Sequence, residues 1–296
     1  MNYWLTLHSI RDIGPVTFNK LLDKFGTPEK VFSASREELM QIPRLSESII
    51  NLILCAKPPC YRTTGSYKDN KIISELKNRQ FELITKYDKR YPELLKKSTV
   101  PPPIIYVYGE MEHSNPRTGR QGLIAIIGAR NASRVGLNKA LEFGKYFAHK
   151  GFSIVSGYAK GIDTYAHLGA IIGGGKTIMV LPVGVLNFVV HKELEYMRDK
   201  LFAQSVIFSE FYPSAGWLTG QAMLRNRRIS ELSKAVIVIE PGVKGGTIAT
   251  TKWAKKLNKP IFIYEKLFSI RKKEFLELGA IPIETPEDVI TYLNKK

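Results

Sequence analysis

Three arginines lie within the seven residues of the segment LRNRRIS, which runs from Leu224 to Ser230. Guanidinium groups this close together repel one another unless anionic groups lie among them. Phosphate oxygens are one source of such anions, because arginine binds a phosphate through two parallel hydrogen bonds. The carboxylates of Glu210, Glu231 and Glu240 are another source, within the chain itself. The segment therefore indicates an anion site and leaves open which anion each arginine holds.

The composition extends this preference for anions to the whole chain. Its 296 residues include 44 Lys and Arg against 27 Asp and Glu, a net charge of +17, and 44% of them are hydrophobic. That hydrophobic fraction is ordinary for a soluble globular protein, and the length suits more than one domain. The positive charge favours a polyanionic partner, nucleic acid first, although a lysine-rich solvated surface would give the same count.

Signals for disulfides, metals, export and membranes are sparse. Cys55 and Cys60 are the only cysteines, without the second pair that a metal site or a disulfide framework needs. Arg11 and Asp12 interrupt the N-terminal segment before a signal peptide can form, and the uncharged run at 177–190 is too short to cross a bilayer. We expect a cytoplasmic protein with free thiols and no membrane partner.

Apolar residues recur at helical spacing over residues 1–56. Two turns, DIGPVTF (12–18) and QIPRLSES (41–48), interrupt the pattern, and each leads from an apolar residue through Gly or Pro into a helix start. They resemble tandem helix-hairpin-helix units, whose turns direct backbone N–H groups at a DNA phosphate. Pro43 and Arg44 replace the usual glycine of the second turn. A small helical bundle used only for packing is therefore an equal alternative.

The composition changes again after this helical segment. Pro, Gly, Thr and Ser dominate residues 57–70, which indicates a linker. We expect a small all-α domain with its linker at 1–66 and a larger domain at 67–296, with an exposed loop at 113–122. The larger domain would end in a short helix at 287–294, without a C-terminal winged helix.

Short apolar runs alternate with helical patterns from residue 123 onward. The runs are LIAII, FSIV, TIMVL, SVIF, AVIVIE and IFIY. Strands that are apolar on both faces and alternate with helices predict an α/β fold with a doubly wound, mainly parallel sheet. Ligands of such sheets bind beyond the carboxyl ends of the strands. The loops there, such as GARNASR, SGYAKGID and EPGVKGGT, combine glycine, hydroxyls and cations, and predict a phosphate-binding rim.

Two segments match nucleotide-binding signatures only in part. The first loop, IIGARNASRVG, lacks the G-x-G-x-x-G spacing, and the second strand ends in Ser156 and Gly157 instead of the acidic residue that grips a ribose. The segment AIIGGGKT (170–177) nearly matches a P-loop. It follows a helix and precedes a strand, however, which is the reverse of the P-loop context, so it is better interpreted as the turn into TIMVL.

A hydrolase signature is incomplete as well. PGVKGGTIATT (241–251) resembles the PGG-x-GT-x-x-E loop of Rossmann-like nucleotide phosphoribohydrolases, but Thr250 stands where the catalytic glutamate is expected. Asp163 and His167 share one helix face and have the chemistry for acid–base catalysis. The more economical interpretation makes Asp163 the N-cap of its helix and His167 a buried hydrogen-bonding partner.

The loops taken in order form a larger pattern. IIGARNASRVG, IVSGYAKGIDTYAHLGAI, GGGKTIMVLPVGV and the stretch from SEFYPSAG to GGTIAT resemble, collinearly, the DNA processing protein A family (DprA, also called Smf). The resemblance runs from about residue 81 to about residue 288, and the N-terminal helices are similar to the family's leading domain. It implies an extended Rossmann-like domain that binds single-stranded DNA, forms homodimers and assists loading of the RecA recombinase in DNA uptake, natural transformation and recombination, without catalysis or cofactor.

The resemblance also implies the residues that hold the strand. Arg130 corresponds to the family's first phosphate-gripping arginine. Tyr158, Phe211, Tyr212 and Trp217 lie near the rim and are candidates either for base stacking or for the core. The segment LNFVVHKEL (186–194) departs from the family, which usually has Asp and then Tyr-Pro there. The implied DNA- or phosphate-binding residues are Gly128, Arg130, Ser133, Ser156, Gly157, Lys160, Gly161, Arg225, Asn226, Arg227, Arg228, Lys244, Gly245, Gly246 and Thr247.

Overall fold

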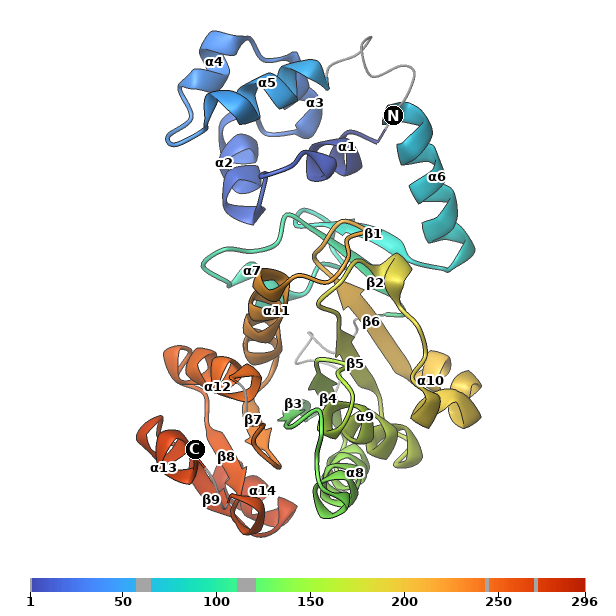
Figure 1. Ribbon diagram of the computed structural model, residues 1–296, viewed down its shortest axis with the longest axis vertical. Helices are drawn as coiled ribbons and strands as arrows, with labels where there is room; N and C mark the ends of the chain where they lie inside the picture. The colour runs from blue at the N-terminus through green and yellow to red at the C-terminus, as the bar shows by residue number, and fades with distance from the viewer. Residues whose placement is uncertain (1, 57–64, 111–120, 243–244, 269–270, 296) are drawn as a thin grey trace.

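A computed structural model describes residues 2–56, 65–110, 121–242, 245–268 and 271–295. In this part of the chain one mixed sheet of nine strands carries helices on both faces, and a group of short helices packs beside β1 and β2 at one edge of the sheet (Figure 1). This arrangement confirms the predicted α/β class with a leading helical unit. The predicted loop at 113–122 and Cys60 lie largely or wholly outside the described residues.

The leading unit contains five short helices. They are α1 (Tyr3–Ser9), α2 (Pro15–Phe25), α3 (Pro28–Ser33), α4 (Arg36–Met40) and α5 (Glu47–Cys55). The two predicted turns have equivalent backbones: Asp12 and Arg44 both adopt positive φ, 67° and 64°, two residues before the N-cap residues Gly14 and Ser46. Arg44 therefore takes the left-handed conformation that a glycine would take more easily.

The helix α6 (Gly65–Asn78) begins earlier than the sequence predicts, so residues 65–70 are helical instead of linker. A tertiary contact explains the difference, because the hydroxyl of Thr6 in α1 donates to the carboxylate of Asp69 at 2.5 Å. The rest of the predicted linker, 57–64, lies outside the described residues. His8 and Asn19 attach the same helical unit to the sheet region, through the Tyr106 hydroxyl (2.9 Å) and the Pro101 carbonyl (2.8 Å).

The sheet is mainly parallel, as predicted. Its order is β1-β2-β6-β5-β4-β3-β7-β8-β9; the seven strands from β3 to β9 are parallel, and β2 runs antiparallel to both β1 and β6. The strands are β1 (Glu82–Thr85), β2 (Ile104–Tyr108), β3 (Gly122–Ile127), β4 (Phe152–Ser156), β5 (Thr177–Val180), β6 (Ser205–Ser209), β7 (Ala235–Val238), β8 (Ile261–Tyr264) and β9 (Ile281–Ile283).

Apolar side chains on both faces of these strands require a helical layer on each side. Ile154 packs with the core under α8 (Arg134–His149), α9 (Ile162–Ile172) and α14 (Pro286–Asn294), whereas its neighbour Val155 packs with the opposite core. The second core contains side chains of α7 (Glu93–Lys96), α11 (Thr219–Leu232), α12 (Gly246–Lys256) and α13 (Lys272–Glu277).

The connection between β5 and β6 is not a single helix. It contains two 3₁₀ segments, η4 (Val185–Asn187) and η5 (Lys192–Met197), and then α10 (Arg198–Gln204); a third, η6 (Glu265–Leu267), follows β8. Among the described residues, no helix is long and apolar enough to cross a membrane.

Candidate nucleic-acid interface

The predicted rim lies where the sheet changes direction. β3 is hydrogen-bonded to β4 on one side and to β7 on the other. The loop after β3 leads into α8 on one face of the sheet, and the loop after β7 leads into α12 on the opposite face (Figure 1). Such a switch point opens a crevice beyond the carboxyl ends of the strands, where ligands of this fold class bind.

The loops after β3 and β4 pack directly on each other. Gly161 has φ 82°, and a Cβ atom at this position would overlap the carbonyl oxygens of Ala129 and Arg130. The N–H of Ile162 donates to the Ala129 carbonyl at 3.1 Å, and a Cβ on Gly128 would overlap the Ile162 side chain. Only glycine fits at 128 and 161, so these two residues bring Arg130 and the loop at 157–161 together.

Asp163 holds the second loop, a role that differs from the predicted N-cap. Gly161 is the N-cap residue of α9, and the carboxylate of Asp163 instead accepts hydrogen bonds from the N–H groups of Gly157 (3.1 Å) and Ala159 (3.4 Å). Burial raises the pKa of Asp163, while the nearby charge of Arg225 and these N–H donors oppose that rise. The prediction placed Asp163 on the correct helix but missed that its partners are in the loop.

His167 is the buried hydrogen-bonding partner that the sequence predicts. Its Nδ1 atom lies 2.7 Å from the Thr177 hydroxyl, and the residue is fully buried. Burial lowers the pKa of His167 to about 3, so the imidazole is neutral. His167 therefore belongs to the packing between α9 and β5.

Arg225 lies beneath the loop that follows β4, residues 157–161. Its Nη1 atom donates to the carbonyl of Gly157 and, at 3.3 Å, to that of Val180, and the residue is only 5% exposed. Burial lowers the pKa of Arg225 to about 10, although Asp163 opposes the shift. Arg225 thus brings a positive charge to the underside of the loop that the sequence assigns to phosphate binding.

Arg227 and Arg228 hold carboxylates of the protein. Arg228 is 1% exposed and pairs with Glu210 at 2.7 Å and with Glu231 at 2.8 Å. Burial alone would lower the pKa of Arg228, but the two carboxylates raise it above its ordinary value. Arg227 pairs with Glu231 at 2.7 Å and lies over the Trp253 ring. The anions among these two arginines are therefore glutamates, and a phosphate contact for either one has no geometric support.

A carboxylate also lies at the start of α8. Both oxygens of Glu240 accept the N–H of Ser133 at 3.1 Å, and Oε2 accepts its hydroxyl at 2.7 Å. Ser133 itself caps α8 by accepting the N–H of Gly136 at 3.0 Å. The N-terminus of α8, where dinucleotide-binding proteins place a pyrophosphate, thus already faces an anionic side chain.

The rim continues at the start of α12. The side-chain amide of Asn226 donates to the carbonyl of Gly246 at 3.3 Å, and Gly245 is the N-cap residue. Thr247 is buried, and its hydroxyl has no hydrogen-bond partner in the described structure. Lys244 lies outside the described residues. Asn226 thus connects α11 to the α12 end of the rim.

Three exposed cations project around the loops that follow β3 and β4. They are Arg130, Lys160 and Arg134, and none forms an ion pair with another described residue. Arg134 is the first residue of α8, and the sequence analysis did not assign it. Positive charge at a helix N-terminus is unfavourable by itself, and the negative charge at this N-terminus comes from Glu240.

The candidate stacking residues divide into two groups. Tyr158 and Phe211 are each 8% exposed and belong to the core, and Tyr212 is half-buried. Trp217 is 53% exposed, and the nearby Leu218 (61%) and Met223 (47%) are exposed as well. Among these four aromatic residues, Trp217 has the accessible ring face that base stacking requires.

Comparison with protein families matches this architecture. The sequence model described as DNA recombination-mediator protein A matches residues 82–294, which contain the sheet and all the loops described above. The chain belongs to the DNA recombination-mediator protein A family. A second match, SAM-like helix-hairpin-helix tandem, covers residues 5–54 and agrees with the two equivalent turns of the leading helices.

The chain is also similar in sequence to individual members of the recombination-mediator family. The chain is 28% identical to protein Smf of Synechocystis sp., covering 88% of this chain and 63% of that protein, so it spans under two thirds of that relative. It is 29% identical to DNA processing protein DprA of Bacillus subtilis, covering 76% of this chain and 76% of that protein.

Solved structures agree. The X-ray structure of DprA from Streptococcus pneumoniae has a TM-score of 0.64 at 25% identity and covers 94% of this chain and 98% of that chain. A second structure concerns the single-stranded DNA binding mode of DNA processing protein A from Helicobacter pylori. It has a TM-score of 0.62 at 25% identity and covers 73% of this chain and 96% of that chain.

Within this family framework, the hydrolase signature stays incomplete. Thr250 is buried on α12, its hydroxyl lies 3.5 Å from the Gly246 carbonyl, and its own carbonyl accepts the Ser230 hydroxyl at 2.9 Å. The position expected to carry a catalytic glutamate is therefore part of the packing between α11 and α12.

Proposed function

We propose that the protein binds single-stranded DNA along the rim and does not catalyse a reaction there. The observation that carries this proposal is the group of exposed, unpaired cations Arg130, Arg134 and Lys160 around tightly packed glycine loops at the switch point. Backbone phosphates would bind to these side chains with release of counterions. The description of the Helicobacter pylori relative as a single-stranded DNA-binding protein supports the same ligand.

A polymer suits this rim better than a dinucleotide does. Glu240 faces the N-terminus of α8 and would repel a pyrophosphate there. Arg130 and Lys160 lie in the two loops that pack on each other and would bind phosphates spaced along a strand. Trp217 presents an exposed ring that stacks on any base without reading sequence. The remaining predicted rim residues would shape the loops that carry the cations. They are Gly128, Ser133, Ser156, Gly157, Gly161, Asn226, Gly245, Gly246 and Thr247.

We further propose that the bound strand is passed to the RecA recombinase, that the protein acts as a homodimer, and that this occurs in DNA uptake, natural transformation and recombination. Membership of a recombination-mediator family supports this part. The domains proposed for it are the helical unit at 1–66 and the DNA-binding domain at 67–296. Assembly of RecA on a labelled strand, followed with and without the protein, and sedimentation of the protein alone would test both claims.

Competition binding would test the choice of ligand. Fluorescence anisotropy of a labelled oligothymidylate would be measured with unlabelled single strand, duplex or thymidine monophosphate as competitor. We expect the single strand to compete best. Stronger competition by the mononucleotide would support a nucleotide-binding enzyme or a nucleotide-sensing module instead. Release of bases from nucleoside monophosphates would identify a nucleotide phosphoribohydrolase-like enzyme.

A further inference from the structure

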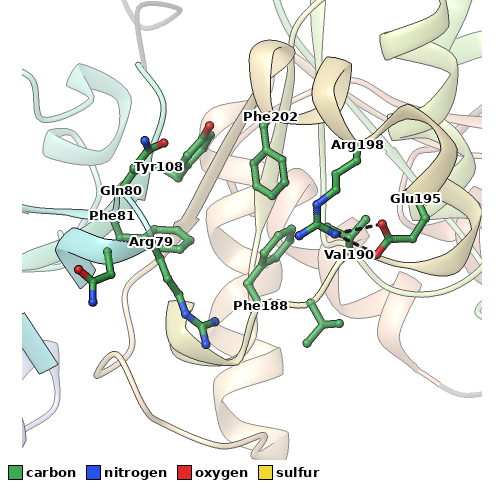
Figure 2. A pocket seen from close by; sticks show the side chains of 11 residues that line it. Arg79, Gln80, Phe81, Tyr108, Phe188, Val190, Glu195, Arg198 and Phe202 are labelled. Carbon is green, nitrogen blue, oxygen red and sulfur yellow. Dashed lines mark hydrogen bonds and ion pairs between the residues drawn. The ribbon is translucent and has the colours of Figure 1, made fainter. Parts of the chain in front are cut away.

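A cavity lies outside the rim, beside the loop that follows β5. It has a volume of about 540 Å³ and lies between the junction of α6 with β1 and the segment 188–202 (Figure 2). This volume is in the range of small-molecule binding sites, about 300–1,000 Å³. The segment overlaps the stretch 186–194 that departs from the family pattern.

Aromatic rings form a continuous wall of this cavity. Phe81 meets Tyr108, Tyr108 meets Phe202, and Phe202 meets Phe188, with ring centroids 5.9, 5.3 and 6.3 Å apart in edge-to-face geometry. In Figure 2 the rings surround one open space. Three of the four residues are only half-buried, so ring surface remains accessible to a ligand.

Two guanidinium groups lie at the mouth of the cavity, on either side of the Phe188 ring (Figure 2). Arg79 is exposed and uses Nη1 to donate to the Leu186 carbonyl at 2.9 Å. Arg198 pairs with Glu195 at 3.0 Å, with the Arg198 side chain 54% exposed. One carboxylate therefore offsets only one of the two positive charges, and the mouth keeps a net positive charge.

We propose that this cavity binds one nucleotide unit, with its base on the aromatic wall and its phosphate at Arg79 and Arg198. A flat, apolar ring surface suits a base of any sequence, and guanidinium groups suit phosphate oxygens. The unit belongs to a single strand that leaves the rim, so the inference rests on the proposed function. A free nucleotide has the same chemistry, and the experiment separates the two sources.

The loop after β5 connects the cavity to the rim. The hydroxyl of Tyr158, in the rim loop after β4, accepts the N–H of His191 at 2.9 Å and donates to the Val189 carbonyl at 3.1 Å. The Tyr158 ring lies 5.1 Å from that of Phe188, which lines the cavity. Val189 is 72% exposed on this loop. A strand that crosses Val189 from the rim therefore reaches the aromatic wall.

Photo-crosslinking would locate the base without any substitution in the protein. A long oligothymidylate that carries photoreactive thymidine analogues would be irradiated in complex with the full chain, and the attached peptides would be identified by mass spectrometry. We expect attachment at Phe188, Tyr108 or Phe202 in addition to the rim. Attachment confined to the rim would overturn the proposal.

A pair of double variants tests the charges. In Arg79→Gln/Arg198→Gln the affinity for a long strand should fall about tenfold, as expected for loss of a phosphate contact and of an ordered, stacked base. The affinity for an oligonucleotide too short to leave the rim should stay unchanged. Lys77→Gln/Lys200→Gln is the matched control, because both lysines are exposed and neighbour the cavity without lining it.

The outcomes separate the claims. An equal loss for short and long strands, or in both double variants, would overturn the proposal. A third outcome is that thymidine monophosphate binds the wild type, that Arg79→Gln/Arg198→Gln abolishes this binding, and that the affinity for the long strand is unchanged. The cavity would then bind a free nucleotide, and the proposal that it binds a unit of the strand would be wrong. If the long strand binds wild type and Arg130→Ala equally, the proposed rim function fails, and the crosslinks still report on the cavity.

Discussion

Arg228 lies in the protein interior between two carboxylates, which makes it a structural residue within a segment that first indicates ligand binding. Glu210 and Glu231 are each about 95% buried with it. A buried ion pair contributes little compared with apolar packing, but removing one partner leaves an uncompensated charge. The same residue type therefore has opposite roles at positions 130 and 228, according to its exposure.

Arg228→Met should lower the free energy of unfolding by about 3–5 kcal/mol, because it leaves the buried Glu210 without its counter-ion and leaves Glu231 with Arg227 alone. Arg130→Met should change it by no more than about 0.5 kcal/mol, because Arg130 is exposed and unpaired. Urea denaturation of both variants would measure this difference. Equal stability of the two variants would show that Arg228 is not structural.

His167 predicts an acid sensitivity. Its pKa is about 3 in the folded protein and 6.5 in the reference state, so below pH 6.5 the unfolded state binds a proton that the folded state does not. The contribution of His167 to the free energy of unfolding is therefore full above pH 6.5 and decreases toward pH 3 by about 1.4 kcal/mol per pH unit. Between pH 7 and pH 5, wild type should lose about 2 kcal/mol more than His167→Gln in chemical denaturation. An identical loss would contradict a neutral, buried His167.

At the scale of elements, two glycines that both have a positive φ have different surroundings. Gly161 (φ 82°) packs on the loop after β3, whereas Gly174 (φ 73°), in the turn before β5, has open space where a Cβ would lie. The positive φ alone disfavours alanine at both positions, at a cost on the order of 1–3 kcal/mol each. Only position 161 adds a steric overlap with the neighbouring loop.

Gly161→Ala should therefore destabilise the protein more than Gly174→Ala and should also weaken binding of single-stranded DNA, since the loops that carry Arg130 and Lys160 must separate. Thermal unfolding and anisotropy, both corrected for the folded fraction, would measure the two effects. If Gly174→Ala reduced DNA affinity as strongly as Gly161→Ala, the packing of these two loops would not be what organises the rim.

The elements that the sequence predicts well are those with an unambiguous pattern. Strands such as β3 and β4 are apolar on both faces, and their ends fall within one residue of the runs LIAII and FSIV. The early start of α6 was missed because its cause, the bond between Thr6 and Asp69, is tertiary. The strand β9 was missed because it is three residues long and contains Pro282.

The candidate site was predictable in its place but not in its side-chain directions. Parallel topology places the loops after β3, β4 and β7 at one edge, so the position of the rim follows from the pattern. The burial of Arg225, Arg227 and Arg228 does not, because α11 packs against the sheet and also against α7 and α12. A helix enclosed on several sides has no polar face to read from spacing.

At the scale of the whole molecule, the excess positive charge acts through a few accessible groups. Several lysines near the end of α12 have structural partners. Lys255 donates to the Glu277 carbonyl at 3.0 Å, and Lys259 donates to the carbonyls of Ser230 and Glu231 at 2.6 Å. Exposed cations at the rim remain available, and others lie at the opposite edge of the sheet. Lys145 and Lys150 are exposed near the C-terminal end of α8, remote from the rim at its N-terminal end. DNA binding therefore depends on which cations can reach the strand, and not on the total number of cations.

The most direct measurement is the salt dependence of oligothymidylate binding, followed by anisotropy, for wild type, Arg130→Ala/Lys160→Ala and the matched control Lys145→Ala/Lys150→Ala. Each phosphate contact to a single strand contributes about −0.7 to the slope of log K against log salt. The rim variant should therefore lose affinity and have a slope shallower by about 1.4, while the control keeps the wild-type slope. Equal slopes for all three proteins would contradict a DNA-binding rim at the switch point.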